Sequence, residues 1–334
     1  MPNSFDSPAK RHIRSAWGKS LLKFLYETLN SKLIYLGLPS ENPEDIYEWI
    51  DYLDEVYAFQ CREYPEPSEE NQSREKVVLL ERKLRTLEIQ NRLSYSVVFD
   101  GYIEEVVLNG IDNNPEPTTF GHEDTITVYN LDFCNQITTP IKYNKDGIPK
   151  EAYKFDAVKE LLRYQKQTND LSKKFILFLT INAKYSDEHV TKHVYEHFKD
   201  YYNSVSRLGG IETRSRILKT YVFKIMRDAF EYHNFIPEFL PVIRYKGVGK
   251  NNILLHFTVV GTYETQSPGG ISVPQDVERF LYKKFLTVED EVFVPLTLNV
   301  EGFKETNPKS NPVELFQKTK VFKSFWQKPQ DEEK

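Results

Sequence analysis

Several glycines and polar residues in this sequence directly follow short apolar runs, where an α/β protein would place ligand-binding turns. The runs LIYLG, VYAFQ, VVFDG and VYNLDF all end in this way. Asp132 is the most informative, because a carboxylate just after a buried strand must reach the sheet edge or find partners there. Ligands of open α/β sheets bind at the carboxyl ends of the strands. The candidate site residues are Gly37, Gln60, Asp100, Gly101, Asn130, Asp132 and Phe133.

Three histidines, His189, His193 and His197, recur at every fourth position in DEHVTKHVYEHF. On a helix this spacing puts the imidazoles on one face, where they could bind a metal. A structural metal site would need a further ligand, and none is evident nearby. We therefore expect a solvated or half-buried helix face and no metal. The sequence also has no GxxxxGK[ST], HExxH, GxSxG or CxxC motif.

The stretch RLGGIETRSRILKTYVFKIMR interleaves cations with aromatic residues, a pattern that can supply phosphate contacts and base stacking for RNA or DNA. Its candidate nucleic-acid ligands are Arg207, Arg214, Arg216 and Lys219. A second basic cluster near Trp17 comprises Lys10, Arg11, Arg14 and Lys19. The alternative is an ordinary charged helix face, which is slightly favoured. The two clusters would have to share one side of the molecule to form a binding surface.

The composition describes a folded globular protein. The chain has 334 residues, 40% of them hydrophobic and 14% aromatic, so it can bury a large core. A net charge of −5 gives no global attraction to nucleic acid, and such binding would need a local basic face. Two cysteines are too few for a disulfide framework, and the charged N-terminal stretch predicts neither a secretory signal nor a membrane span. We expect a cytoplasmic protein without membrane partners.

The elements that must position these residues alternate along the chain. A basic helix over about 13–30 precedes a strand at 33–38, a helix from PEDIYEWI, a strand at 56–60, a helix from KVVLLERKL and a strand from YSVVFD. A long turn-rich loop leads to a strand at 125–133. After another helix comes KKFILFLTINA (173–183), whose continuous apolar run is typical of a strand buried on both faces. Two helical regions and a hairpin signal around Val-Gly-Lys close the series.

This order predicts an α/β protein with a doubly wound, mostly parallel seven-stranded sheet that ends in an antiparallel hairpin. We expect a basic N-terminal helix over 1–30, a Rossmann-like domain over 31–265, and a linker with a C-terminal appendage over 266–334. Five alternating strands, then helices, then a terminal hairpin resemble the class I S-adenosylmethionine-dependent methyltransferase fold, in which the last strand inserts antiparallel. The resemblance covers about residues 31–265 and rests on element order.

The resemblance implies roles for the turn residues. Gly37, Gln60, Asp100 and Gly101 would hold S-adenosylmethionine, although the first turn is degenerate, with Gly37 as its one glycine and Pro39 after it. Asn130, Asp132 and Phe133 resemble the Asn/Asp-Pro-Pro-Tyr/Phe motif of amino-methylating members with both prolines lost. The segment LDFCN also resembles the Asp-Pro-Phe-Gly form of tRNA guanine methyltransferases. These three residues are the catalytic candidates.

Three functions remain open from the sequence. The leading hypothesis is a bacterial S-adenosylmethionine-dependent methyltransferase acting on nucleic acid or on a protein linked to it. The second is a catalytically inactive relative that serves as a binding or partner subunit, for example in a bacterial defence or RNA-associated complex. The third, ranked last, is a metal-dependent hydrolase using Asp132. An active methyltransferase should be open at Gly37, Gln60 and Asp100, whereas an inactive relative should fill this space with Tyr35, Leu38 or Tyr102.

Overall fold

The structure is a computed structural model, and it describes residues 7–60, 73–133, 136–145, 147–169, 173–183, 188–248, 252–263, 280–281, 285–289, 292–295 and 311–317. The helices are α1 (Pro8–His12), the π-helix η1 (Ile13–Gly18), α2 (Lys19–Leu29), α3 (Glu44–Trp49), α4 (Ser73–Ile89), α5 (Ile103–Asn109), α6 (Lys154–Gln167), α7 (Glu188–His197), α8 (Lys199–Val205), α9 (Gly210–Tyr232) and α11 (Pro312–Gln317). The strands are β1 (Leu33–Gly37), β2 (Leu53–Gln60), β3 (Tyr95–Asp100), β4 (Val128–Asp132), β5 (Ile141–Lys145), β6 (Ile148–Ala152), β7 (Lys174–Asn182), β8 (Phe235–Phe239), β9 (Ile243–Lys246), β10 (Ile253–Tyr263), β11 (Leu286–Glu289) and β12 (Val292–Pro295).

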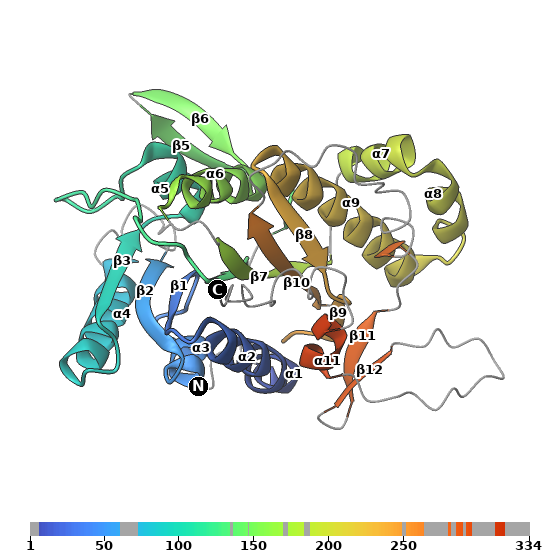
Figure 1. The fold of residues 1–334 in the computed structure, drawn as a ribbon. Coiled ribbons are helices and arrows are strands. Elements are labelled where there is room, and N and C mark those ends of the chain that lie inside the picture. The colour runs from blue at the N-terminus through green and yellow to red at the C-terminus, as the bar shows by residue number, and fades with distance from the viewer. Residues whose placement is uncertain are drawn as a thin grey trace, which may run out of the picture.

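One large sheet organises the molecule (Figure 1). Its strand order is β12-β11-β9-β10-β7-β4-β1-β2-β3, and β8 also pairs with β10. Strands β3, β2, β1, β4 and β7 are parallel to their neighbours in this series. The order reverses at β1, which lies between β2 and β4, and such a switch point is where open α/β sheets bind ligands.

The predicted antiparallel closure is confirmed. Strand β10 runs antiparallel to β7 and pairs on its other side with β8 and β9. The sequence predicted one continuous strand, FLPVIRYKG, as the first arm of this hairpin, whereas the structure has two short strands, β8 and β9, on either side of Pro241. Proline has no N–H to donate to a ladder, which explains the break.

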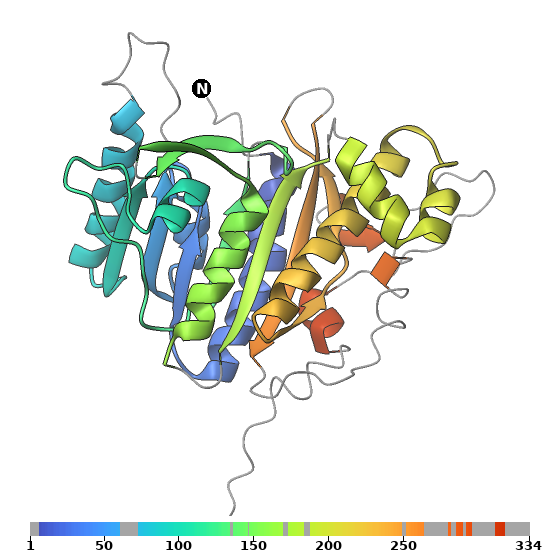
Figure 2. The ribbon, with the colours of Figure 1, turned by 90° about the horizontal axis from the view of Figure 1, so that it is seen from above.

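Helices cover both faces of the sheet (Figure 2). Helices α2, α3 and α4 pack on one face, in a cluster that includes Leu21, Trp49 and Leu80. Helices α5, α6 and α9 pack on the other, in a cluster that includes Phe155 and Met226. This doubly covered sheet is the predicted fold class, and it explains why β7 is buried over seven consecutive residues.

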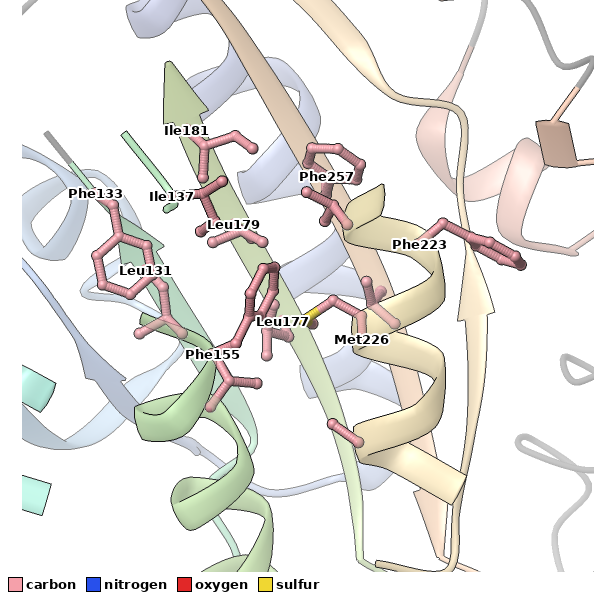
Figure 3. Close-up of a cluster of buried hydrophobic side chains, with 14 of the residues drawn as sticks. Leu131, Phe133, Ile137, Phe155, Leu177, Leu179, Ile181, Phe223, Met226 and Phe257 are labelled. Atoms are coloured by element: carbon pink, nitrogen blue, oxygen red, sulfur yellow. The ribbon is translucent and has the colours of Figure 1, made fainter. Parts of the chain in front are cut away.

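The core on the α6 and α9 side is drawn in Figure 3. Leu177 of β7 lies between Phe155 of α6 and Met226 of α9, and Leu179 and Ile181 follow along the strand in the direction of Ile137. Alternate residues of a strand face opposite sides, so Ile176 and Phe178 enter the other cluster. The position of each polar residue along its strand therefore decides which face of the sheet its side chain points toward.

Two elements were not expected. An antiparallel hairpin, β5–β6, follows β4 before α6 begins. In the C-terminal appendage, β11 pairs with β12 and also joins the sheet beside β9, through Leu286 and Ile243. The described part of the appendage thus extends the sheet beyond the seven predicted strands. The whole predicted linker (266–275) and both cysteines lie outside the described residues.

Candidate functional site

A buried polar cluster fills the carboxyl end of β1. Tyr35 Oη donates a hydrogen bond to Asp45 Oδ2 at 2.5 Å, and Asn130 Nδ2 donates to the same oxygen at 2.6 Å. Asp45 lies in the first turn of α3, and Asn130 of β4 is in register with Gly37. Burial, followed by the nearby Asp45 charge, raises the pKa of Tyr35 well above its ordinary value, so the phenol stays a donor.

This cluster accounts for the glycine at position 37. A Cβ on Gly37 would lie 2.3 Å from Tyr35 Oη and 2.7 Å from the backbone oxygen of Asn130. The position is therefore occupied by the protein's own atoms, and any larger residue would clash. Asn130 was expected to orient a target amine. Its side-chain amide instead donates hydrogen bonds to Asp45 and Tyr35.

The carboxyl ends of β2 and β3 are also closely packed. Asp100 is 0% exposed; its carboxylate lies 4.0 Å from Arg74 Nε, and its backbone N–H donates to Asp112. Gly101 has a φ of +142°, and a Cβ there would lie 2.9 Å from Asn113 Nδ2. Gln60 is buried and in register with Asp100. The structure thus brings the four predicted cofactor residues to one edge of the sheet, with protein atoms against three of them.

Asp132 differs, because its side chain keeps 23% of its surface exposed at the carboxyl end of β4. It forms an ion pair with Lys10 of α1. In the sheet Asp132 is in register with Thr180 of β7, which is in turn in register with His256 of β10. Thr180 Oγ1 lies 2.9 Å from His256 Nδ1, in hydrogen-bond contact. These four residues form a second polar group, which we name the Asp132 cluster.

His256 is the most unusual member of the Asp132 cluster. It is 7% exposed, it stacks on Phe178, and its Nε2 atom has no hydrogen-bond partner among the described residues. Burial lowers the pKa of His256 to about 4, with Asp132 opposing and Lys10 adding to this shift. The imidazole is therefore neutral near pH 7.

Phe133 is a core residue. It is buried in the cluster of Figure 3, with Lys154 Nζ 5.7 Å from the centre of its ring. Lys154 in turn lies 3.8 Å from the Glu104 carboxylate, and burial raises the pKa of Glu104. The ring of Phe133, one of the three catalytic candidates, is therefore covered by the protein's own side chains.

Two of the four predicted nucleic-acid ligands hold the C-terminal segment instead. Lys219 is 1% exposed and donates from Nζ to the carbonyl oxygens of Phe280 and Leu281. The Phe285 ring lies 5.1 Å from Lys219 Nζ, and the guanidinium groups of Arg216 and Arg244 also face it. We name this group the Phe285 cage. The amphipathic pattern predicted the helix, but Arg216 and Lys219 face inward because the appendage packs there.

Arg216 and Arg244 share one carboxylate. Arg216 Nε lies 2.6 Å from Glu212 Oε1, and Arg244 Nη1 lies 2.5 Å from Glu212 Oε2. Arg207 and Arg214 remain exposed. In the second basic cluster, Lys10 pairs with Asp132 and Lys19 with Glu48. Paired cations contribute less to phosphate binding, because the carboxylate must first be displaced.

The histidine row lies on α7 as predicted, on one helix face. The His193 and His197 rings stack with their centres 4.3 Å apart, and the His189 and His193 rings both contact Tyr221 of α9. Within the described part of the chain, no three His, Cys, Asp or Glu side chains are grouped so as to hold a metal ion. Burial lowers the pKa of His193.

The sequence did not predict the hydrogen bond between Tyr35 and Asp45 or the contact between His256 and Thr180. The first signal was present, since a tyrosine two residues before a lone glycine can fold over it. The second was a single histidine inside the apolar run ILLHFTVV. Only the strand order reveals that this histidine lies beside Thr180, because β10 inserts next to β7.

Comparisons with known proteins found distant structural likenesses and no match in sequence. No family model matches the sequence, and no curated protein does. Solved structures with a similar fold include a putative O-methyltransferase from Klebsiella pneumoniae, at 10% identity and a TM-score of 0.34, covering 78% of this chain and 82% of that one. A geranyl diphosphate methyltransferase in complex with SAM gives 9% identity and a TM-score of 0.33, covering 79% and 93%.

The small RNA methyltransferase HEN1 gives 10% identity and a TM-score of 0.35; the match covers 80% of this chain but 27% of that one. The first structure in the comparison, EvdMO1, is covered over 44% of its length. No helix among the described residues is long and apolar enough to cross a membrane. The parallel strands in the order β3-β2-β1-β4-β7 and the antiparallel β10 beside β7 give the chain the strand order of a methyltransferase-like Rossmann fold.

Proposed function

We propose that this chain is a binding protein built on the methyltransferase-like fold, and that it does not use S-adenosylmethionine. The observation that carries the proposal is the phenol of Tyr35. It lies where a Cβ of Gly37 would be and is fixed there by Asp45, which also binds Asn130. The methionine end of the cofactor would have to approach the backbone at this turn.

The residues on the adenosine side support the same proposal. Asp100 is fully buried beside Arg74, and Asn113 packs against Gly101. A ribose or adenine would need these groups to face an opening. The residues present therefore do not fit S-adenosylmethionine in this conformation, and we derive no methyl-transfer step through them.

Methyl transfer to nucleic acid, or to a target associated with it, is the second candidate. It is favoured by the strand order, which includes the antiparallel β10, and by the partly exposed carboxylate of Asp132, paired with Lys10, at the carboxyl end of β4. This function would require the contacts among Tyr35, Asp45 and Asn130 to open. The two proposals therefore differ in one measurable quantity, the affinity for the cofactor.

Calorimetric titration with S-adenosylmethionine and S-adenosylhomocysteine tests the proposal. We expect no binding heat from the native chain at millimolar ligand. An Asp100→Ala variant is the matched control, because binding heat that comes from another site on the protein would be unchanged by this substitution. Micromolar binding that Asp100→Ala weakens would refute the binding-protein proposal, establish the cofactor site and favour the second candidate.

RNA is the partner class to test next, because Arg207 and Arg214 remain exposed on the basic stretch. Fluorescence anisotropy with single-stranded RNA should show weak, salt-dependent binding that Arg207→Glu and Arg214→Glu reduce. Lys192→Glu, on the neighbouring α7, is a control of equal charge change, since Lys192 lies outside the basic stretch and is exposed. Equal losses in all three variants would argue against a site at these arginines.

A further inference from the structure

Helix α7 is held to the rest of the molecule by a narrow apolar contact. It lies beside α9 at one end of the molecule (Figures 1 and 2), and its buried residues are Val190 and Val194. Helix α9, in contrast, is buried along much of its length. Segments with few buried apolar contacts are the ones that open locally in a folded protein.

The connection to α8 allows α7 to move separately. Phe198 is the one residue between the two helices, and its φ of −140° and ψ of 53° lie outside the helical region. Helix α8 has its own anchors in Tyr201 and Val205, each 4% exposed. Hinges are usually one or a few such residues at the end of an element.

The rest of the contact between α7 and α9 is made by titratable rings. His193 stacks on His197 with ring centres 4.3 Å apart, and it meets the buried ring of Tyr221 at 5.2 Å, edge to face. The Nε2 atom of His193 is buried and has no hydrogen-bond partner among the described residues. Two protonated rings at this separation would repel each other, and the charged His193 would have a second N–H to satisfy.

The surroundings of His193 oppose its protonation. Burial is the largest cause that lowers its pKa, followed by His197, Lys224 and His189, while Asp228 acts in the opposite direction and is itself paired with Lys224. The other charged groups of α7 and of the start of α8 are Glu188, Lys192, Glu196, Lys199 and Asp200. Because the packed pKa is below the ordinary value of 6.5, the contact is complete above about pH 6.5 and weakens as the pH falls.

We propose that α7 is a pH-sensitive gate, in which protonation of the stacked His193 and His197 in mild acid releases the helix from α9. The helix turns about Phe198 while α8 stays in place. Its release uncovers Val190, Val194 and the ring of Tyr221, which the neutral histidines keep closed.

Hydrogen exchange of the native chain between about pH 7.5 and 5 tests the release. After correction for the intrinsic pH dependence of amide exchange, protection of the α7 amides should be constant above about pH 6.5 and be lost below it. Protection in α8 and α9 should persist, because their buried residues do not titrate with His193. Protection of α7 that holds at low pH would overturn the proposal, and so would an equal loss in all three helices.

Variants of the pair identify the groups responsible. Glutamine is polar and does not titrate, so the double variant His193→Gln with His197→Gln should abolish the pH dependence in α7. His197→Gln alone, at an exposed position, should weaken it because the second charge is absent. His233→Gln is the matched control, since burial also lowers the pKa of His233 but this residue follows the far end of α9.

The control should keep the full transition in α7. A transition that survives unchanged in both pair variants would show that other groups cause it, and the proposal would fail. None of these readouts involves the turn at Gly37, S-adenosylmethionine or RNA, so the gate and the proposed function can fail separately.

Discussion

The buried neutral imidazole of His256 should make stability fall in mild acid. Burial lowers its pKa to about 4, while an unfolded histidine titrates near its ordinary value of 6.5. Between these two values the unfolded chain binds a proton that the folded chain does not. The stabilisation is therefore complete above about pH 6.5 and is lost as the pH falls toward 4.

The size of this effect follows from the two pKa values. The loss in free energy of unfolding should be about 1 kcal/mol at pH 5.5 and about 2 to 3 kcal/mol at pH 4.5, both relative to neutral pH. The charged groups that face His256 act in opposite directions, since Asp132 raises its pKa and Lys10 lowers it. Burial is the largest cause, and it sets the sign.

Urea denaturation across this pH range, on the native chain and on His256→Gln, measures the contribution. Glutamine keeps a polar partner for Thr180 but does not titrate. The other histidines with a lowered pKa, His122, His193 and His233, act with the same sign and cancel in the difference between the two proteins. If both proteins lose stability in parallel between about pH 6.5 and 4.5, His256 is not buried as a neutral group and the reasoning fails.

Three further outcomes follow from the packing. Tyr35→Phe should lower the free energy of unfolding by about 1 to 3 kcal/mol in chemical denaturation, because Asp45 loses a buried donor. Tyr57→Phe is the control and should cost less, because this phenol is half-buried and paired with Glu55. Equal losses in the two variants would contradict the buried cluster of Tyr35, Asp45 and Asn130. Gly37→Ala should cost about 1 to 3 kcal/mol or more in the same assay, because its Cβ meets the Tyr35 phenol and a backbone oxygen; a neutral result would mean that the turn is open. Lys219→Met should release the Phe285 cage and speed proteolysis of the C-terminal segment without changing RNA binding, and reduced RNA binding at unchanged proteolysis would reverse this assignment.

The sequence was sufficient for the fold because the periodic signals were strong. The continuous apolar run at 173–183 predicted a strand buried on both faces, and β7 (Lys174–Asn182) is that strand at the centre of the sheet. The hairpin signal around Val-Gly-Lys likewise predicted the antiparallel closure by β10. Local sequence patterns of this kind predict the fold because each face of a strand must pack against a helix layer of matching polarity.

The candidate site was predictable only in part. The strand-end rule correctly brought Gly37, Asn130 and Asp132 to one edge of the sheet. It could not say whether that edge faces a ligand or the protein's own side chains. Tyr35 is two residues from Gly37 in the chain, but its partner Asp45 belongs to α3, and a contact between two elements has no local signature.

What the sequence alone determined about this protein is the class of its elements, their order and the edge where polar residues gather, since these depend on spacing along the chain. The tertiary structure decided which partner each polar side chain contacts. Lys219 and Arg216 face the C-terminal segment, Lys10 meets Asp132 from the far end of the chain, and His256 meets Thr180 across two strands. Each of these pairings joins residues that are distant in sequence, and only the packing of the sheet with its helices brings them together.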